Sequence, residues 1–334
     1  MTRAELDRDE LSSILSLYHL EGLEAFGDLP GGPGSRTYWV RASGRRYLLR
    51  LSTRRRFADL LFEKDLLVHL RQAGLPVPRV VENLASGAFT PWSARGRYVW
   101  LFEDLGGRRL GIFELRAHHT RAIGQFLGRM HLAALSFPAG RTGDLELAHF
   151  ERQWDRLGRA LATGRLAQRH REAVEELGRE LKEQKRRHPH GTRGIIHSDL
   201  FVGNASFSRD RLNGVLDFER ACSERLNWDL AVAINAWCWE PSARQSGGPA
   251  GGFGPARVRS FLRGYESVRP LPAAERTELA HDLRLAALRL ALKRLVEFEL
   301  STSTSSSTGY RDYRHFLARL AALEGRRAEA LLAS

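Results

Sequence analysis

Two carboxylates and one carboxamide stand at the ends of short apolar runs between residues 194 and 229. Ile195 and Ile196 lead into the triplet His197-Ser198-Asp199, and Asn204 follows five residues after Asp199. A second apolar run, 212–216, ends in Asp217. The polar stretch 208–211 between the runs has a composition typical of turns. The pattern therefore predicts strands that deliver Asp199, Asn204 and Asp217 at their ends.

Such a set of side chains suits phosphoryl transfer from ATP. That reaction needs positioning of the acceptor hydroxyl and cancellation of phosphate charge, with little covalent help from the protein. One Asp can accept the hydroxyl proton, while a second Asp and an Asn can hold Mg²⁺, which prefers hard oxygen ligands. The same residue types also occur as ordinary turn residues and strand-end caps, so the spacing has to be considered together with its context.

The spacing H-x-D-x4-N, followed by a hairpin and D-F, resembles the catalytic loop and metal-binding Asp of the protein-kinase-like superfamily. It is most similar to the aminoglycoside phosphotransferase branch. The resemblance implies that Asp199 is the catalytic base, that His197 supports the loop, and that Asn204 and Asp217 bind Mg²⁺. It also implies a two-lobed α+β fold: an N-lobe with a small antiparallel sheet over 1–105, and a larger, mainly helical C-lobe over 106–334.

A glycine-rich stretch near the N-terminus fits this expectation. Residues 29–35, LPGGPGS, precede two alternating apolar segments around Ser43-Gly44, which predict a β-hairpin. A loop that covers phosphates needs glycine, because the backbone has to approach the phosphate closely. A plain surface hairpin gives the same pattern. The candidates for contacts to the nucleotide are Gly32, Gly34, Ser35 and Thr37.

The superfamily places a Lys at the end of the second hairpin strand, paired with an acidic residue on the next helix. This chain has Arg50 there, which keeps the charge but changes the geometry. The helix predicted over 58–72 carries Glu63 and Asp65, and the resemblance favours Asp65 as the partner of Arg50. A strand over 97–102 then runs into a segment that the resemblance makes the hinge between lobes, with Glu103 and Leu105 beside the adenine.

Helical periodicity predicts the other main elements. Amphipathic or apolar helices are expected over 5–20, 117–135, 166–187, 228–239, 256–266, 273–300 and 310–332. His131 is interpreted as a packed helix residue, and Asp229 as an architectural residue that holds a neighbouring loop through hydrogen bonds. The stretch 242–255 and the Ser/Thr tract 301–308 are predicted to be linkers.

Three longer phrases narrow the resemblance. GIIHSDLFVGN, RLNGVLDFERAC and WDLAVAINAWC are similar to phrases of the homoserine kinases of the aminoglycoside-phosphotransferase-like type. That family phosphorylates a small hydroxyl acceptor, L-homoserine, in threonine synthesis, and its members imply Arg289 and Arg294 as ligands of the acceptor carboxylate. The chain departs from the family at Glu219 and Arg220, because the family has an aromatic residue directly after D-F. It departs again at 290–293, where the family phrase LRFWLSRL is LRLALKRL in this chain. Of these positions, Glu219 and Arg220 are the other candidates for acceptor contacts.

Composition limits the remaining possibilities. At 334 residues the chain is long enough for two lobes with cores of their own. Its two cysteines, Cys222 and Cys238, form no disulfide framework and predict buried side chains in a reducing cytoplasm. The net charge of +13 is spread along the chain with acidic residues between the basic ones, which argues against nucleic acid as the partner. The sequence contains no apolar run of membrane-spanning length and no apolar signal core at its start.

The prediction is therefore a kinase that uses ATP and Mg²⁺ to phosphorylate a small hydroxyl compound, with L-homoserine as the acceptor. One alternative is the same reaction on an amino alcohol, a sugar or an aminoglycoside. The other is a non-catalytic, nucleotide-binding relative, which the Arg at position 50 would favour. The sequence gives no prediction of the oligomeric state.

Overall fold

The computed structural model describes residues 6–29, 35–52, 56–83, 90–92, 97–187, 190–242, 250–300 and 312–333. The chain divides into two compact units, Met1–Gly107 with Asn213–Glu219, and Arg108–Leu212 with Arg220–Ser334. The first break lies two residues beyond the predicted boundary at 105. The chain then returns to the first unit for Asn213–Glu219, the segment that carries Asp217.

The first unit is built on an antiparallel sheet with the strand order β1-β2-β3-β6-β4, in which β5 also pairs with β6. The strands are β1 (Leu23–Leu29), β2 (Ser35–Ala42), β3 (Arg45–Ser52), β4 (Val80–Val81), β5 (Thr90–Trp92) and β6 (Arg97–Glu103). The hairpin of β2 and β3 and the strand β6 confirm the sequence analysis. The edge strand β1 was not predicted, because it shows little alternation of apolar and polar residues.

Strand alternation gives the sheet two chemically different faces. Tyr38, Val40, Leu49 and Leu51 share one core with α1 (Arg8–Ser16), whose first turn is closed by a capping box. Arg50, between Leu49 and Leu51, must therefore face the other way. Its cross-strand neighbours are one residue of β2 and one of β6, Thr37 and Trp100.

Helix α2 (Phe57–Gln72) follows the sheet strand that carries Arg50, and it ends where the sequence predicts. Gly74 adopts φ +73°, a left-handed conformation that suits glycine after a helix. The segment that follows receives the returning chain: the Val215 N–H donates to the Pro76 carbonyl at 3.0 Å. A Cβ on Gly214 would lie 2.3 Å from Leu105 Cδ1 and 2.8 Å from the Pro76 carbonyl oxygen, so only glycine lets the chain approach this closely.

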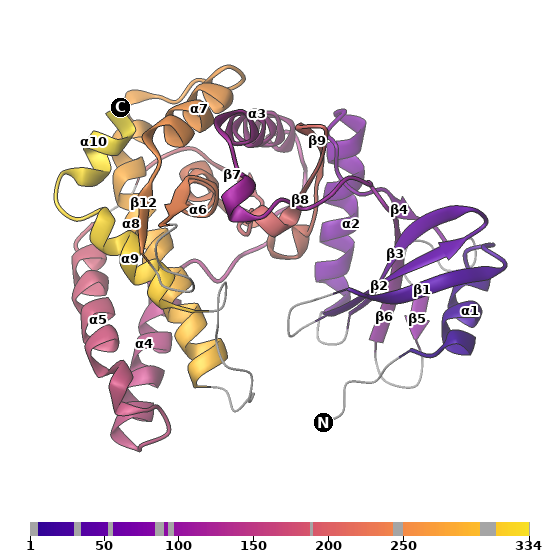
Figure 1. The fold of residues 1–334 in the computed structure, drawn as a ribbon, viewed down its shortest axis with the longest axis horizontal. Coiled ribbons are helices and arrows are strands. Elements are labelled where there is room, and N and C mark those ends of the chain that lie inside the picture. Colours follow the sequence, from indigo (N-terminus) through magenta and orange to yellow (C-terminus); the bar gives the residue numbers. More distant parts are fainter. Residues whose placement is uncertain are drawn as a thin grey trace. The chain divides into compact units, whose positions relative to one another are not determined.

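The second unit is mainly helical (Figure 1). Its helices are α3 (Ala117–Ala134), α4 (Leu147–Ala162), α5 (Arg171–Lys185), α6 (Leu226–Trp237), α7 (Pro255–Glu266), α8 (Ala273–Arg294), α9 (Arg314–Ala322) and α10 (Arg327–Ala333). The remaining short strands are β7 (Arg193–Ile196), which pairs with β10 (Cys222–Arg225), β8 (Ala205–Ser208), which pairs with β9 (Arg211–Val215), and β11 (Trp239–Pro241), which pairs with β12 (Gly251–Phe253). Strand β9 begins in the second unit and ends in the first.

Helix α6 forms the centre of this unit. Every one of its residues is buried, and it packs against α3, α7 and α8 and against strand β7. In Figure 1 it lies among these helices. The predicted helices are present, although the last one is divided into α9 and α10, and a π-helical turn, Leu295–Glu299, follows α8. Helix α4 was not predicted. The Ser/Thr tract 301–308 and the centre of the predicted linker, 243–249, lie outside the described residues.

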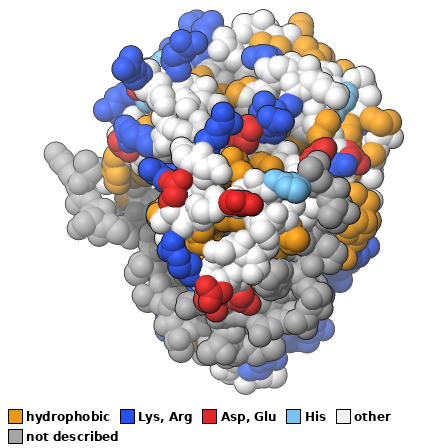
Figure 2. All heavy atoms as spheres, turned by 90° about the vertical axis from the view of Figure 1, so that its right-hand side faces the viewer, with side chains coloured by type: hydrophobic (Ala, Val, Ile, Leu, Met, Phe, Trp, Pro, Cys, Tyr) orange, Lys and Arg blue, Asp and Glu red, His pale blue; other side chains and the backbone are white. Residues whose placement is uncertain are grey.

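The two cysteines are buried and free, as predicted. Burial raises the pKa of the Cys222 thiol to about 11, and burial also raises the pKa of Cys238. Within the described part of the chain, the helices are all too short or too polar to span a bilayer. On the face drawn in Figure 2, basic side chains are interspersed with acidic and apolar ones and form no stripe of a single sign.

Glycines let α3 and α7 approach closely. A Cβ on Gly264 would lie 2.2 Å from the backbone oxygen of Arg121, and one on Gly124 would lie 2.1 Å from that of Phe261. Gly158 in α4 is also helical, but a Cβ there would meet nothing within 4 Å.

We expect Gly264→Ala to lower the free energy of unfolding by about 1–3 kcal/mol, because the two helices have to separate. Gly158→Ala should raise it by about 0.5–1 kcal/mol, because alanine favours the helix and fits the site. Chemical denaturation of both variants tests this pair. Equal effects of the two substitutions would contradict the close packing of α3 on α7.

Candidate active site

The loop that carries Asp199 is held by one buried carboxylate, that of Asp229 on α6. Its two oxygens accept the backbone N–H groups of His197 and Ser198, each at 2.6 Å, and the side chain is 0% exposed. Asp229 Oδ2 also lies 3.2 Å from Nε2 of His131, whose Nδ1 lies 2.9 Å from the Tyr265 hydroxyl. The expected roles of Asp229, which holds the loop, and of His131, a packed helix residue, are thereby confirmed.

These hydrogen bonds support a strained turn. Ser198 has φ +67°, a left-handed conformation that is unfavourable for a residue with a side chain. Such residues cost about 1–3 kcal/mol and persist only where the surroundings fix them. His197 is buried, and its Nδ1 accepts the N–H of Asp199 at 3.3 Å. The turn therefore sets the direction in which Asp199 projects.

Asp199 lies among positive charges. Arg220 Nε is 3.8 Å from Asp199 Oδ2, while the buried Oδ1 has no hydrogen-bond partner within the described chain. Burial works to raise the pKa of Asp199, but the charges of Lys293, Arg220 and Arg289 outweigh it and lower the pKa. The carboxylate is therefore ionised at neutral pH, and one of its oxygens is available to a hydroxyl donor.

Asn204 closes the same loop from its other end. Its Nδ2 donates to the Asp199 carbonyl at 2.8 Å, which leaves Oδ1 as the side-chain atom that can coordinate a cation. The Trp237 indole N–H donates to the Leu200 carbonyl at 3.0 Å and anchors the middle of the loop on α6. Asp199 and Asn204 thus come from one rigidly held segment of the second unit.

In the first unit Arg50 is the central charged residue. Its Nη1 lies 2.9 Å from Glu63 Oε1, and its Nη2 lies 3.7 Å from Asp217 Oδ1. Burial opposes the charge of the guanidinium, but Glu63, Asp217 and Glu219 together raise the pKa of Arg50. Arg50 also lies over the ring of Phe102, at 5.2 Å. Arg50, which stands where the superfamily has Lys, is therefore held by two carboxylates and an aromatic ring.

The predicted partner of Arg50 was wrong. Asp65 is paired with Lys64 at 3.0 Å, and its side chain is 54% exposed, whereas Glu63 is 1% exposed. The apolar positions of α2 could have identified Glu63, because it shares a helical stripe with Leu60 and Leu67, three residues before it and four after it. The acidic residue that faces the sheet is the one within the buried stripe.

Asp217 follows β9 in a left-handed conformation, with φ +64°. Its side chain is 42% exposed, and the close approach at Gly214 fixes the strand that leads to it. Asp217 belongs to the first unit and Asn204 to the second. The expected pair of Mg²⁺ ligands therefore comes from both units, and its joint coordination stays a prediction.

Other residues predicted to contact the nucleotide also fall in the first unit. Thr37 lies opposite Arg50 in the β2–β3 register, and Ser35 begins β2. Gly32 and Gly34 lie outside the described residues. The Glu103 side chain pairs with Arg79 at 3.1 Å, and the Leu105 carbonyl accepts the side-chain N–H of Asn213 at 3.1 Å.

The candidates for acceptor contacts separate into different environments. The charge of Glu219 helps to raise the pKa of Arg50, whereas Arg220 forms an ion pair with Asp199. Arg289 on α8 is 5% exposed, lies 5.6 Å over the Trp228 ring, and has a buried Nη1 without a hydrogen-bond partner in the described chain. Arg294 lies over a different ring, Phe316, at 4.1 Å and donates to a backbone carbonyl at 3.3 Å. The charge of Arg289 helps to lower the pKa of the Asp199 carboxyl.

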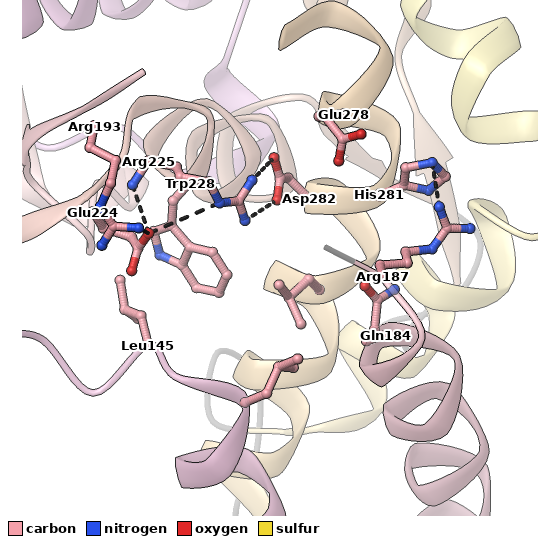
Figure 3. A pocket seen from close by; sticks show the side chains of 12 residues that line it. Leu145, Gln184, Arg187, Arg193, Glu224, Arg225, Trp228, Glu278, His281 and Asp282 are labelled. Atoms are coloured by element: carbon pink, nitrogen blue, oxygen red, sulfur yellow. Dashed lines mark hydrogen bonds and ion pairs between the residues drawn. The ribbon is translucent and has the colours of Figure 1, made fainter. Parts of the chain in front are cut away.

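A cavity of about 180 Å³ lies beside Trp228 (Figure 3). Several of the charges that line it pair with one another: Arg225 donates two hydrogen bonds to Asp282, at 2.8 and 2.6 Å, and Arg193 lies 3.0 Å from Glu224. These paired groups form a polar wall behind the aromatic ring that supports Arg289. We interpret the cavity as part of the framework of the site.

Two adjacent histidines at the start of α3 approach an aspartate. The Nε2 atoms of His118 and His119 are 3.0 Å apart, and Nε2 of His119 is 3.1 Å from Asp210 Oδ1. However, Nδ1 of His119 accepts the Arg116 backbone N–H, at 3.0 Å, so that in the neutral ring Nε2 carries the proton. The group is therefore a hydrogen-bonded cap of α3. The Nε2 atom of His119, which would have to bind a metal through its lone pair, carries a proton.

A family comparison gives the class of protein. The model of the phosphotransferase enzyme family matches residues 28–271, which include strands β2 to β6 of the first unit and the Asp199 loop. The chain belongs to this family.

Curated relatives narrow the class further. The chain is 34% identical over 291 residues to the homoserine kinase of Xanthobacter autotrophicus, covering 86% of this chain and 85% of that one. It is 31% identical over 329 residues to the homoserine kinase of Methylobacterium radiotolerans, covering 95% and 94%. The sequence resemblance to homoserine kinases is thereby confirmed.

Solved structures confirm the fold. A microcompartment-associated aminopropanol kinase matches with a TM-score of 0.67 at 20% identity, over 98% of this chain and 99% of that one. An amicoumacin kinase in complex with AMP-PNP and Ca²⁺ matches with a TM-score of 0.67 at 18% identity, over 97% and 94%. The predicted two-lobed α+β architecture is therefore correct.

We expect Asp229→Asn to disturb the catalytic loop, because an amide cannot accept from both backbone N–H groups with its two terminal atoms. Hydrogen bonds to charged groups contribute about 1.5–3 kcal/mol each, so unfolding should become easier by about 2–3 kcal/mol. Phosphotransferase activity should fall at least tenfold as Ser198 relaxes. Asp155→Asn on the exposed face of α4 is the control. A variant at position 229 with wild-type stability and turnover would show that the loop does not depend on this carboxylate.

Proposed function

We propose that the protein is a homoserine kinase that transfers the γ-phosphoryl group of ATP to the side-chain hydroxyl of L-homoserine, the phosphorylation step of threonine synthesis. The observation that supports this most directly is the environment of Asp199. Its buried Oδ1 lacks a partner within the described chain, and a buried, equally unpartnered Arg289 Nη1 belongs to the same unit. An acceptor with a hydroxyl and a carboxylate would satisfy both.

In the proposed reaction Asp199 orients the acceptor hydroxyl and takes its proton. The hydroxyl oxygen forms a bond to the γ-phosphorus as the bond from that phosphorus to the bridging β,γ-oxygen breaks, and ADP leaves. A carboxylate suits this role because the positive surroundings keep it ionised. The unpartnered oxygen is the atom that accepts the hydroxyl.

The donor set of Asn204 and Asp217 fits a hard divalent cation. Asn204 uses its nitrogen within the loop and leaves an oxygen, and Asp217 supplies a half-exposed carboxylate. A bound Mg²⁺ would neutralise phosphate charge during the transfer. Arg50 would contact the phosphates, and the backbone at Glu103 and Leu105 would contact the adenine.

Arg50 supports a catalytic rather than a non-catalytic protein. A protein that no longer transferred phosphate would not need a positive charge at this position. Arg50 is nevertheless paired with Glu63 of the next helix, as the superfamily's Lys is with its acidic residue, and it also lies near Asp217. Arg289 favours homoserine over an amino alcohol, because an amino alcohol would leave the buried guanidinium without an anion.

The activity is tested by following ADP release with Mg²⁺ and ATP on homoserine, serine, choline, ethanolamine and kanamycin. We expect turnover of homoserine at least 100-fold above the others.

Asp199→Ala should lower kcat by about 10²–10⁴-fold and preserve nucleotide binding, because the base acts on the acceptor. Asp217→Ala should also lose the Mg²⁺-dependent part of nucleotide binding. If the protein prefers another acceptor, that compound replaces homoserine as the proposed substrate. Equal nucleotide affinities in both variants would overturn the roles proposed for Asp199 and Asp217.

The ion pair of Arg50 gives a second test with a matched control. Glu63→Gln removes the charge that holds the guanidinium, so the KM for ATP should rise about tenfold. Asp65→Asn removes an exposed charge two residues away and should change the KM less than twofold. Initial rates at varied ATP measure both effects. A larger effect at Asp65 would restore the pairing predicted from the sequence.

A further inference from the structure

Helix α8 presents two cations toward Asp199. Arg289 and Lys293 are four residues apart, so they lie one above the other on the same side of the helix. Each acts electrostatically on Asp199, and the effect of Lys293 is the largest of the three cations around this carboxylate. Arg220 adds a third charge from the segment after Asp217, at 3.8 Å. The neighbourhood of Asp199 therefore carries more positive than negative charge.

The two cations on α8 have no carboxylate partner of their own. No carboxylate of the described residues forms an ion pair with Arg289 or Lys293, in contrast to Arg225 and Arg269, which pair with Asp282 and Glu275 at 2.6–2.9 Å. Arg289 is also buried with an unsatisfied Nη1. A buried cation without a partner is costly, so the arrangement suits an anion that arrives from outside the chain.

We propose that Lys293 is a specificity-determining residue that binds the carboxylate of the acceptor together with Arg289. This inference rests on the proposed function and adds to it a residue that the sequence analysis treated only as a departure from the family. It also assigns the second cation of the site to Lys293 in place of Arg294. Arg294 is one position further along α8, and its guanidinium is occupied by Phe316 and the Asp312 carbonyl.

The electrostatics agree with this geometry. Burial lowers the pKa values of both Arg289 and Lys293. The Asp199 carboxylate, together with Glu297 in the case of Lys293, only partly opposes this effect. A bound carboxylate would supply the missing negative charge to both groups. The hydroxyl end of the same molecule would then meet Asp199, so that the spacing between base and cations selects the length of the acceptor.

The test compares two acceptors that differ only in the carboxylate, L-homoserine and 3-aminopropan-1-ol. Lys293→Gln keeps an unbranched polar side chain, one atom shorter, and removes its charge. We expect it to lower kcat/KM for homoserine about 10- to 100-fold, mainly through KM, because one charge-assisted contact is lost. The value for 3-aminopropan-1-ol should change less than threefold. Lys293→Arg should retain most of the preference for homoserine.

Controls separate this inference from the proposed function. Lys182→Gln, on the exposed face of α5, should leave both acceptors unaffected. Equal losses on the two acceptors in Lys293→Gln, or an unchanged ratio between them, would overturn the role of Lys293 while homoserine kinase activity stands. Wild-type protein that turns over none of the acceptors would instead overturn the function. Calorimetric titration with L-homoserine needs no turnover, so weaker binding by Lys293→Gln would still support the carboxylate contact.

Discussion

The carboxylate of Asp229 is the group on which the catalytic segment depends most. It is fully buried, and it accepts two backbone N–H groups and contacts His131. A buried charge is stable only when its hydrogen-bonding capacity is used, and a loop with a left-handed serine is stable only when its backbone is held. Each of these two unfavourable features compensates the other. Asp199 can therefore project from a rigid turn that is anchored to α6, a helix whose residues are all buried.

The two units surround their central residues with opposite charge patterns. In the first unit a cation, Arg50, is surrounded by Glu63, Asp217 and Glu219, which leaves an excess of negative charge. In the second unit an anion, Asp199, is surrounded by a larger number of cations. The first pattern suits a divalent cation and the second suits an anionic acceptor. A kinase for a carboxylate-bearing alcohol needs both, since its metal and its substrate must be held by charges of opposite sign.

The fold could largely be predicted from the sequence, because apolar runs ending in polar residues locate strand ends and helical periodicity locates helices. The prediction failed where a choice depends on packing. Strand β1 has a weak pattern, and its formation relies on the core that it completes. Helix α4 was missed for another reason, because its buried residues Phe150, Leu157 and Leu161 do recur at helical spacing. Asp65 was preferred to Glu63 because family spacing was followed in place of the buried stripe of α2. The contacts of Arg294 with the Phe316 ring and the Asp312 backbone carbonyl are ones that no spacing reveals.

The departures from the family phrase on α8 also acquire a physical meaning. Leu290 and Ala291, which replace aromatic residues of the family phrase, are buried within the packing of α8, whereas Lys293 adds charge four residues from Arg289. Dispersion contacts are individually weak and tolerate similar molecules, but a desolvated cation strongly disfavours any acceptor that lacks an anion. The added charge of Lys293 would therefore sharpen the choice between homoserine and an amino alcohol. The altered helix is then a reason to expect a carboxylate on the acceptor.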